Sequence, residues 1–185
     1  MDKNEKILIS GTGRCGTTFL IKIFSFLGMD TGFTLDNYEK AIFKNCNAGM
    51  ERKIDSEYSI LKNPNFIKDI DSILNKVTIQ YMIIPIRNFE ESAESRERNG
   101  KACGGLVWGA NDSSSQKDIY NKIFANYLQY MVQYEIPTIF IDFVKMIVDK
   151  EYLFTKLQPI FDKHRITMDV FTPVYEKASQ YSKPI

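Results

Sequence analysis

A short apolar strand that runs into a glycine-rich loop constrains the fold of this chain more than any other feature. Residues 7–9, Ile-Leu-Ile, precede Ser-Gly-Thr-Gly-Arg-Cys-Gly-Thr-Thr, and a helix is expected over 17–27. Glycines in such a loop let the backbone approach a phosphate, and the N–H groups at the helix start converge on the anion. The sequence therefore predicts a phosphate-binding loop at residues 11–18.

The loop has the glycine spacing of a P-loop but lacks its lysine. Gly11, Gly16 and Thr18 stand where the motif has its two glycines and its hydroxyl, and Thr17 occupies the lysine position. Arg14 is the loop's cation. A P-loop that binds ATP uses the lysine at the β- and γ-phosphates. We therefore expect this loop to bind a phosphate ligand other than a triphosphate held in the usual way.

The second half of the loop, Gly-Arg-Cys-Gly-Thr-Thr, resembles the 5′-phosphosulfate loop of sulfotransferases that use PAPS (3′-phosphoadenosine 5′-phosphosulfate). The family pattern is Lys/Arg-Ser-Gly-Thr-Thr/Ser, so Arg14 falls on the cationic position and Cys15 replaces the usual serine. The resemblance implies that the loop binds the 5′ end of PAPS. The residues implied are Gly11, Thr12, Gly13, Arg14, Cys15, Gly16, Thr17 and Thr18.

A second segment carries the same resemblance. Residues 77–86 predict a buried strand that ends at Arg87-Asn88, and Ser95 follows eight residues after Arg87. In these sulfotransferases, a strand ending in Arg-Asn/Asp and a serine eight residues on bind the 3′-phosphate of PAPS. The family often has proline after this pair, where this chain has Phe89. The resemblance implies that Arg87 and Ser95 bind the 3′-phosphate.

Strands and helices alternate along the chain, which predicts an α/β fold with three layers, α/β/α, around a central parallel sheet. Ligands of such sheets bind at the carboxyl ends of the strands, where both phosphate segments fall. At 185 residues the chain is expected to form one domain, 1–185. The resemblance implies the P-loop NTPase-like sulfotransferase fold. Strands are expected at 7–9, 29–32, 59–62, 77–86 and 138–141, and helices at 17–27, 65–75, from 89 onward, 115–134 and 150–161.

The resemblance implies transfer of the sulfuryl group from PAPS to a hydroxyl or amine, with PAP as the product and no metal required. The leaving 5′-phosphate gains negative charge, so a fixed cation beside it lowers the barrier. Arg14 is the candidate for that cation, because a guanidinium is permanently charged. The expected acceptor is a small molecule or carbohydrate that the sequence does not identify.

The sequence identifies the group that takes the proton of the acceptor less specifically than it identifies the phosphate-binding residues. Some branches of the family use a glutamate a little beyond the loop helix, and Glu39 is the first candidate, with Asp36 and Glu51 behind it. Lys62, at the carboxyl end of a predicted strand, is placed to meet the sulfate or the acceptor. The single histidine, His164, is interpreted as a solvated helix-end residue.

Two other functions stay open. A small nucleotide kinase is favoured by the glycine spacing and by an apolar strand that ends in Asp142, like a carboxylate that holds Mg²⁺. The threonine in place of the lysine argues against it, and Asp142 is equally interpreted as a strand-end cap. The third possibility is a domain that binds PAP or another nucleotide without turnover.

The net charge and the cysteine content limit the classes of partner and the cellular compartment that we expect. The net charge is +1 and the pI is near 7.6, so no overall field favours nucleic acid or an anionic membrane. We find no signal-peptide pattern and no apolar run of about 18 residues, and three cysteines suit a reducing cytoplasm. A cytoplasmic protein is therefore expected, without nucleic-acid or membrane partners. Trp108 is interpreted as a packing residue rather than an adenine-stacking one.

Overall fold

A four-stranded parallel sheet forms the centre of the computed structural model, which describes residues 4–43, 48–99 and 104–180. The order across the sheet is β4-β1-β5-β6, and every neighbouring pair is parallel. The predicted α/β fold with a central parallel sheet is confirmed. The strands are β1 (Glu5–Ile9), β4 (Ile60–Lys62), β5 (Thr78–Ile86) and β6 (Thr138–Asp142).

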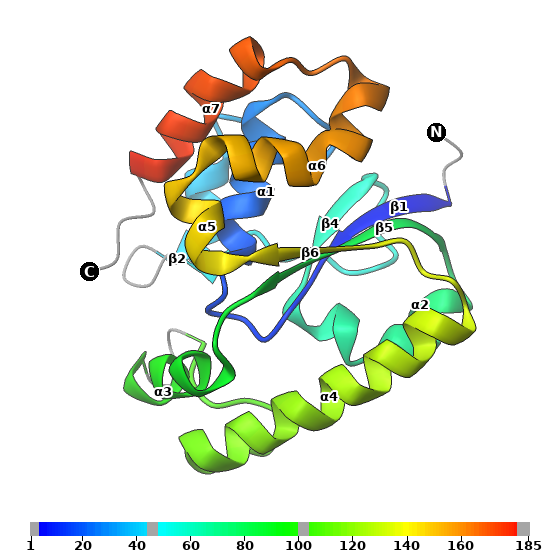
Figure 1. Cartoon of the computed structure of the whole chain (residues 1–185), viewed down its shortest axis with the longest axis vertical. Coiled ribbons are helices and arrows are strands. Elements are labelled where there is room, and N and C mark those ends of the chain that lie inside the picture. Colours follow the sequence, from blue (N-terminus) through cyan, green and yellow to red (C-terminus); the bar gives the residue numbers. More distant parts are fainter. Residues whose placement is uncertain (1–3, 44–47, 100–103, 181–185) are drawn as a thin grey trace.

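Helices cover both faces of this sheet, giving three layers (Figure 1). Successive residues of a strand point to opposite faces, so Ile7 and Ile9 join one hydrophobic cluster while Leu8 joins the other. The first face carries α1 (Thr17–Phe26), α5 (Phe143–Val148), α6 (Lys150–His164) and α7 (Met168–Gln180), and the second carries α2 (Ile70–Leu74), α3 (Phe89–Asn99) and α4 (Ser113–Gln133).

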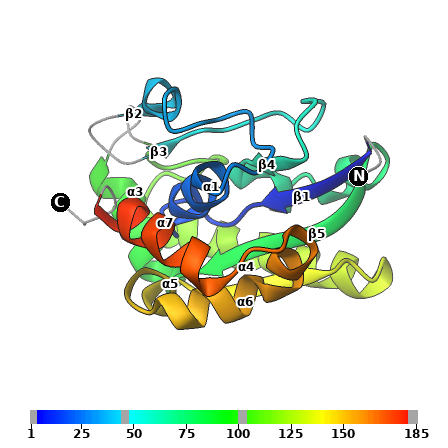
Figure 2. The same cartoon turned by 90° about the horizontal axis from the view of Figure 1, so that it is seen from above.

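The segment between α1 and β4 runs along the β4 edge of the sheet (Figure 2). The N–H of Ile60 donates to the carbonyl of Asp30 at 3.0 Å, and the N–H of Arg52 donates to the carbonyl of Lys62 at 3.0 Å. These bonds cover the short edge strand, whose backbone groups would otherwise be exposed. Along this segment the chain forms a 3₁₀ turn, η1 (Tyr38–Ala41), and a two-stranded antiparallel ribbon of β2 (Ile42–Phe43) and β3 (Ala48–Gly49).

The prediction of a strand at 29–32 is wrong, because this segment turns instead of extending. Gly28 and Gly32 have φ of 72° and 73°, a left-handed backbone that ends α1 and breaks an extended run. The hydroxyl of Thr31 lies 2.8 Å from that of Ser25 in α1, which holds the turn against the helix.

Three helical segments also differ from expectation. The helix expected at 65–75 is two pieces, η2 (Pro64–Ile67) and α2, and the first is capped by the side chain of Asn63, which accepts from the N–H of Asn65 at 3.0 Å. Neither α5 nor α7 was expected. The α5 helix begins because a carboxylate oxygen of Asp142 accepts from the N–H of Lys145 at 2.8 Å, a helix N-cap. Asp149 caps α6 as expected.

Candidate phosphate-binding site

The carboxyl ends of three adjacent strands bring the sequence-predicted segments together. Ile9 at the end of β1 pairs with Lys62 at the end of β4 on one side and with Ile83 of β5 on the other. The glycine-rich loop leaves β1 at this point, and Arg87 follows the last residue of β5. Lys62, the loop and Arg87 therefore lie along one edge of the sheet, the edge where ligands of parallel sheets bind.

The backbone of the loop is left-handed at several positions. Gly13 has φ of 70°, Arg14 of 56° and Gly16 of 89°, while Gly11 has φ of 147°. Gly16 is the N-cap of α1 and has no side chain to accept the first N–H groups of the helix, and the first turn contains no acidic residue. A helix start of this kind suits an anion.

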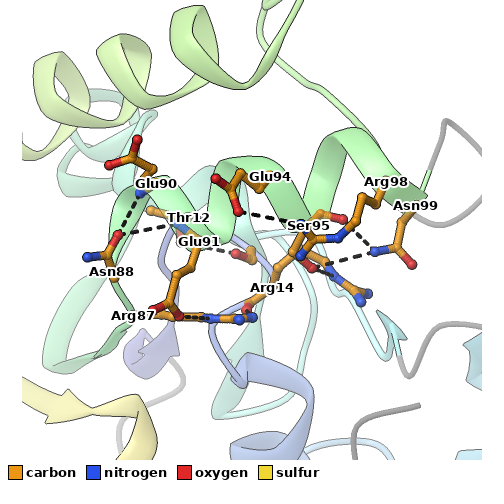
Figure 3. A network of polar contacts seen from close by, with 11 residues as sticks. Thr12, Arg14, Arg87, Asn88, Glu90, Glu91, Glu94, Ser95, Arg98 and Asn99 are labelled. Carbon is orange, nitrogen blue, oxygen red and sulfur yellow. Dashed lines mark hydrogen bonds and ion pairs between the residues drawn. The ribbon is translucent and has the colours of Figure 1, made fainter.

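Arg14 joins the loop to the second predicted phosphate segment (Figure 3). Its Nε donates to the hydroxyl of Ser95 at 3.3 Å, across 81 positions of sequence. The Nη1 of Arg87 donates to the carbonyl of Arg14 at 3.3 Å. The two segments that the sequence predicts as phosphate ligands are thus in direct contact.

Arg87 is partly exposed and pairs with a carboxylate of α3. Its side chain is 24% exposed, and its Nε lies 3.2 Å from a carboxylate oxygen of Glu91, one turn along α3. The guanidinium also lies 5.1 Å from the ring centre of Phe143. Asn88 starts α3, because its side-chain oxygen accepts from the N–H groups of Glu90 at 2.9 Å and Glu91 at 3.3 Å. Glu91 therefore pairs with Arg87 instead of closing the capping box that its position suggests.

The remaining side chains of the loop are buried. Thr12, Thr17 and Thr18 are each at most 7% exposed, and the hydroxyl of Thr12 donates to the carbonyl of Gly13 at 3.0 Å. Cys15 is fully buried, and burial raises the pKa of its thiol. This thiol therefore packs inside the loop as a neutral group. Cys46 and Cys103 lie outside the described residues.

Lys62 is a buried cation with an acidic partner. Its side chain is 2% exposed, donates to the carbonyl of Gly49 at 2.9 Å and forms an ion pair with Glu51. Burial lowers the pKa of Lys62, and the carboxylate of Glu51 acts in the opposite direction. Glu51 is 38% exposed, so its carboxylate faces solvent as well as Lys62. The pair places a carboxylate at the same sheet edge as the loop.

Glu39, the first candidate base from the sequence, has different surroundings. It lies in η1, is exposed, and accepts a hydrogen bond from the hydroxyl of Tyr38 at 3.4 Å. Its charge acts on Lys22 of α1. None of its hydrogen bonds among the described residues reaches the loop or Lys62. Asp36 is exposed in the same segment. The structure thus brings Glu51, rather than Glu39, to the carboxyl ends of the strands.

Arg96 is the residue of this site that sequence reasoning missed. It is 4% exposed, and its Nε and Nη2 donate to the carbonyl of Thr12 at 3.1 and 2.8 Å. Its Nη1 donates to the carbonyls of Gly104 at 2.6 Å and Gly105 at 2.9 Å. The signal was the helical spacing of Ser92, Ala93 and Arg96, which marks one buried face of α3.

The segment before α4, from residue 104 onward, packs beside that helix. The indole N–H of Trp108 donates to the side-chain oxygen of Asn65 at 2.9 Å, and its ring meets Tyr120 edge-on at 6.0 Å. These contacts agree with the interpretation of Trp108 as a packing residue. His164 is exposed at the end of α6, as expected.

A separate pocket of about 630 Å³ lies at the other end of α1. It is lined by residues from Ser25 to Asp36, among them Phe26, Phe33 and Leu35. The ten residues of α1 separate it from the glycine-rich loop. It is therefore not the phosphate site.

No family model, no curated protein and no solved structure matches this chain. Within residues 4–43, 48–99 and 104–180, no group of three or more His, Cys, Asp and Glu side chains is arranged to hold a metal ion. In the same ranges no helix has the length and apolar character of a membrane span.

Proposed function

We propose that this protein is a sulfotransferase that moves the sulfuryl group of PAPS to a hydroxyl or amine. The observation that carries the proposal is the contact of Arg14 with Ser95, together with that of Arg87 with the carbonyl of Arg14. A loop suited to one phosphate and an arginine–serine pair suited to a second phosphate lie within hydrogen-bond distance of each other. This donor set fits a nucleotide with phosphate groups at both the 5′ and the 3′ position.

The chain's own residues have separate tasks in this proposal. The N–H groups at the start of α1 and the hydroxyls of Thr17 and Thr18 bind the 5′-phosphate, and Arg87 with Ser95 binds the 3′-phosphate. PAPS supplies the activated sulfuryl group. Arg14 stabilises the negative charge on the bridging oxygen as the sulfur–oxygen bond breaks, because its charge is fixed and sits in the loop.

The proton of the acceptor is taken by Glu51 in this proposal. Its carboxylate lies beside Lys62 at the carboxyl end of β4, next to the strand that leads into the loop. Lys62 holds the carboxylate in place and supplies positive charge on the acceptor side. In this proposal the segment along the β4 edge shapes the acceptor pocket, and the acceptor is a small molecule or carbohydrate.

A transfer assay tests the proposal. The protein is incubated with PAPS, labelled in the sulfuryl group, and with phenol, sugar and amine acceptors, and PAP release and labelled product are measured. We expect acceptor-dependent PAP release that Arg14→Ala lowers by about 10²–10³-fold and Arg98→Ala leaves unchanged, since Arg98 is exposed and pairs with Glu94. PAP binding without turnover across the acceptor series would favour the non-catalytic domain. Phosphate transfer from ATP with Mg²⁺ would favour the kinase and overturn the proposal.

A further inference from the structure

Arg96 is buried next to the phosphate loop without an acidic partner among the described residues. None of the ion pairs in this part of the chain involves it. Among the described residues, its guanidinium donates to the backbone carbonyls of Thr12, Gly104 and Gly105, and the hydroxyl of Tyr120 also interacts with it. Buried charges are ordinarily paired, because an isolated ion loses its hydration. In the described part of the chain, the guanidinium is therefore offset by carbonyl dipoles and the Tyr120 hydroxyl rather than by a carboxylate.

We propose that Arg96 is a positioning residue that holds the phosphate loop in its binding conformation and favours an anionic phosphate group there through its own buried charge. The inference rests on the proposed function only in taking residues 11–18 as a phosphate site. The ligand class is a phosphate group of a nucleotide or of pyrophosphate. Arg96 itself does not touch the reacting atoms.

The positioning role of Arg96 follows from the two hydrogen bonds that it donates to one carbonyl. Two N–H groups of Arg96 hold the carbonyl of Thr12, so the peptide between Thr12 and Gly13 has one orientation. In a trans peptide the N–H points opposite to the carbonyl, and the N–H of Gly13 is thereby turned away from α3. A Cβ on Gly13 would overlap the guanidinium of Arg96, so the close approach requires glycine.

That the charge of Arg96 favours an anion at the loop follows from a comparison of its partners with those of Lys62. Both cations act electrostatically on Cys15 in the middle of the loop, but Lys62 is paired with Glu51 and Arg96 is not paired. The field of Arg96 at the loop is therefore not cancelled by an acidic neighbour among the described residues. Low-dielectric surroundings strengthen this field relative to that of an exposed charge.

The same guanidinium links the loop to the segment before α4. Its Nη1 holds the carbonyls of Gly104 and Gly105, so Arg96 ties this segment to Thr12. The order of the phosphate loop and of residues 104–105 then depends on one side chain. Binding of an anion at the loop is expected to reduce hydrogen exchange at both places in wild type.

Calorimetric titration with PAP and with inorganic pyrophosphate tests the inference in wild type, Arg96→Met, Arg96→Lys and the control Arg98→Met. Arg98 lies on the same helix but is 66% exposed. We expect Arg96→Met to weaken both ligands by about tenfold or more, the effect of losing one charge-assisted interaction, and Arg96→Lys to weaken them less. Arg98→Met is expected to change affinity less than about twofold.

Two readouts separate this role from a purely structural one. The slope of log affinity against log salt is expected to be shallower in Arg96→Met than in wild type, and guanidinium ion at tens of millimolar is expected to restore part of the affinity in Arg96→Ala. Circular dichroism establishes that each variant is folded at the titration temperature. Should Arg96→Met fail to fold, the comparison of Arg96→Lys with wild type decides.

Wild-type affinity and salt slope in a folded Arg96→Met would overturn the inference, as would wild-type affinity in Arg96→Lys where that variant alone folds. This result differs from failure of the proposed function, in which wild type binds ADP or pyrophosphate and not PAP. In that case the pyrophosphate arm still tests Arg96.

Discussion

The Nε of Arg14 lies 3.3 Å from the hydroxyl of Ser95, although the loop after β1 and the α3 helix after β5 are 81 positions apart in sequence. This contact exists because β1 and β5 are neighbours in the sheet and both segments leave its carboxyl edge. A side chain expected at the 5′-phosphate thus touches a side chain expected at the 3′-phosphate. Binding of a ligand with both phosphates is therefore expected to involve both residues together.

Replacement of Arg14 tests the leaving-group role. Arg14→Ala is expected to lower kcat by about 10²–10³-fold, as loss of one transition-state donor does in other enzymes, with a smaller effect on PAP affinity. Arg14→Lys keeps the charge and is expected to retain part of the rate. Steady-state rates of PAP release measure this. An equal loss of rate in Arg98→Ala, or unchanged kcat in Arg14→Ala, would contradict the role.

Glu51 and Glu39 offer a matched pair for the acceptor base. Glu51→Gln is expected to lower kcat by about 10²–10⁴-fold, the range of general-base catalysis, because its carboxylate lies at the strand ends beside Lys62. Glu39→Gln is expected to leave kcat within about twofold, since Glu39 is exposed in η1. The opposite pattern in the transfer assay would return the role to Glu39.

Alanine substitutions at Gly16 and Gly28 distinguish the effect of backbone strain on stability from the effect of steric overlap. Both have a left-handed backbone, with φ of 89° and 72°, but a Cβ on Gly16 would overlap Met146 and approach Phe143 at 3.1 Å, while one on Gly28 meets nothing within 4 Å. Gly28→Ala is expected to lower the free energy of unfolding by about 1–2 kcal/mol. Gly16→Ala is expected to lower it by about 2–5 kcal/mol, since overpacking adds to the strain. Urea denaturation measures both values, and equal losses would contradict the predicted overlap.

The pH dependence of stability is predicted to contain a contribution from Tyr120. Burial raises the pKa of Tyr120 from 10.0 to about 12. A raised pKa means that the stabilising contribution is complete below pH 10 and is lost as the pH rises toward 12, because the unfolded chain ionises first. Tyr120→Phe keeps the ring contacts with Phe89 and Trp108. We expect the variant to lose less stability than wild type between pH 10 and 12, and parallel curves would show that Tyr120 does not contribute.

The sheet and its ligand edge were predictable because their signals are local. The apolar strands at 7–9 and 77–86, the glycines of the loop and the spacing of Arg87 to Ser95 are all contained in short segments. These features predict that both candidate phosphate segments lie at the carboxyl edge of the sheet. The strand order, in which β1 lies between β4 and β5, is not contained in these local signals and comes from the structure.

The features that the sequence did not predict depend on interactions between distant segments. The burial of Arg96 depends on the carbonyl of Thr12, 84 positions away, and the position of Glu51 depends on Lys62. The helical spacing of Ser92, Ala93 and Arg96 marks a buried face of α3, but this local pattern does not show which distant backbone groups Arg96 binds. The α7 helix contains Pro173, a residue that disfavours helix interiors, and it forms because Phe171 and Tyr175 pack on the core over α1.

Titration calorimetry with PAP, in the absence of Mg²⁺ and with ADP and ATP as comparison ligands, tests the central claim most directly. The claim predicts that wild type binds PAP in preference to ADP and ATP, and that Arg87→Ala weakens PAP by about tenfold or more while Arg98→Ala binds like wild type. Preferential binding of ATP with Mg²⁺, or PAP affinity that does not depend on Arg87, would contradict it.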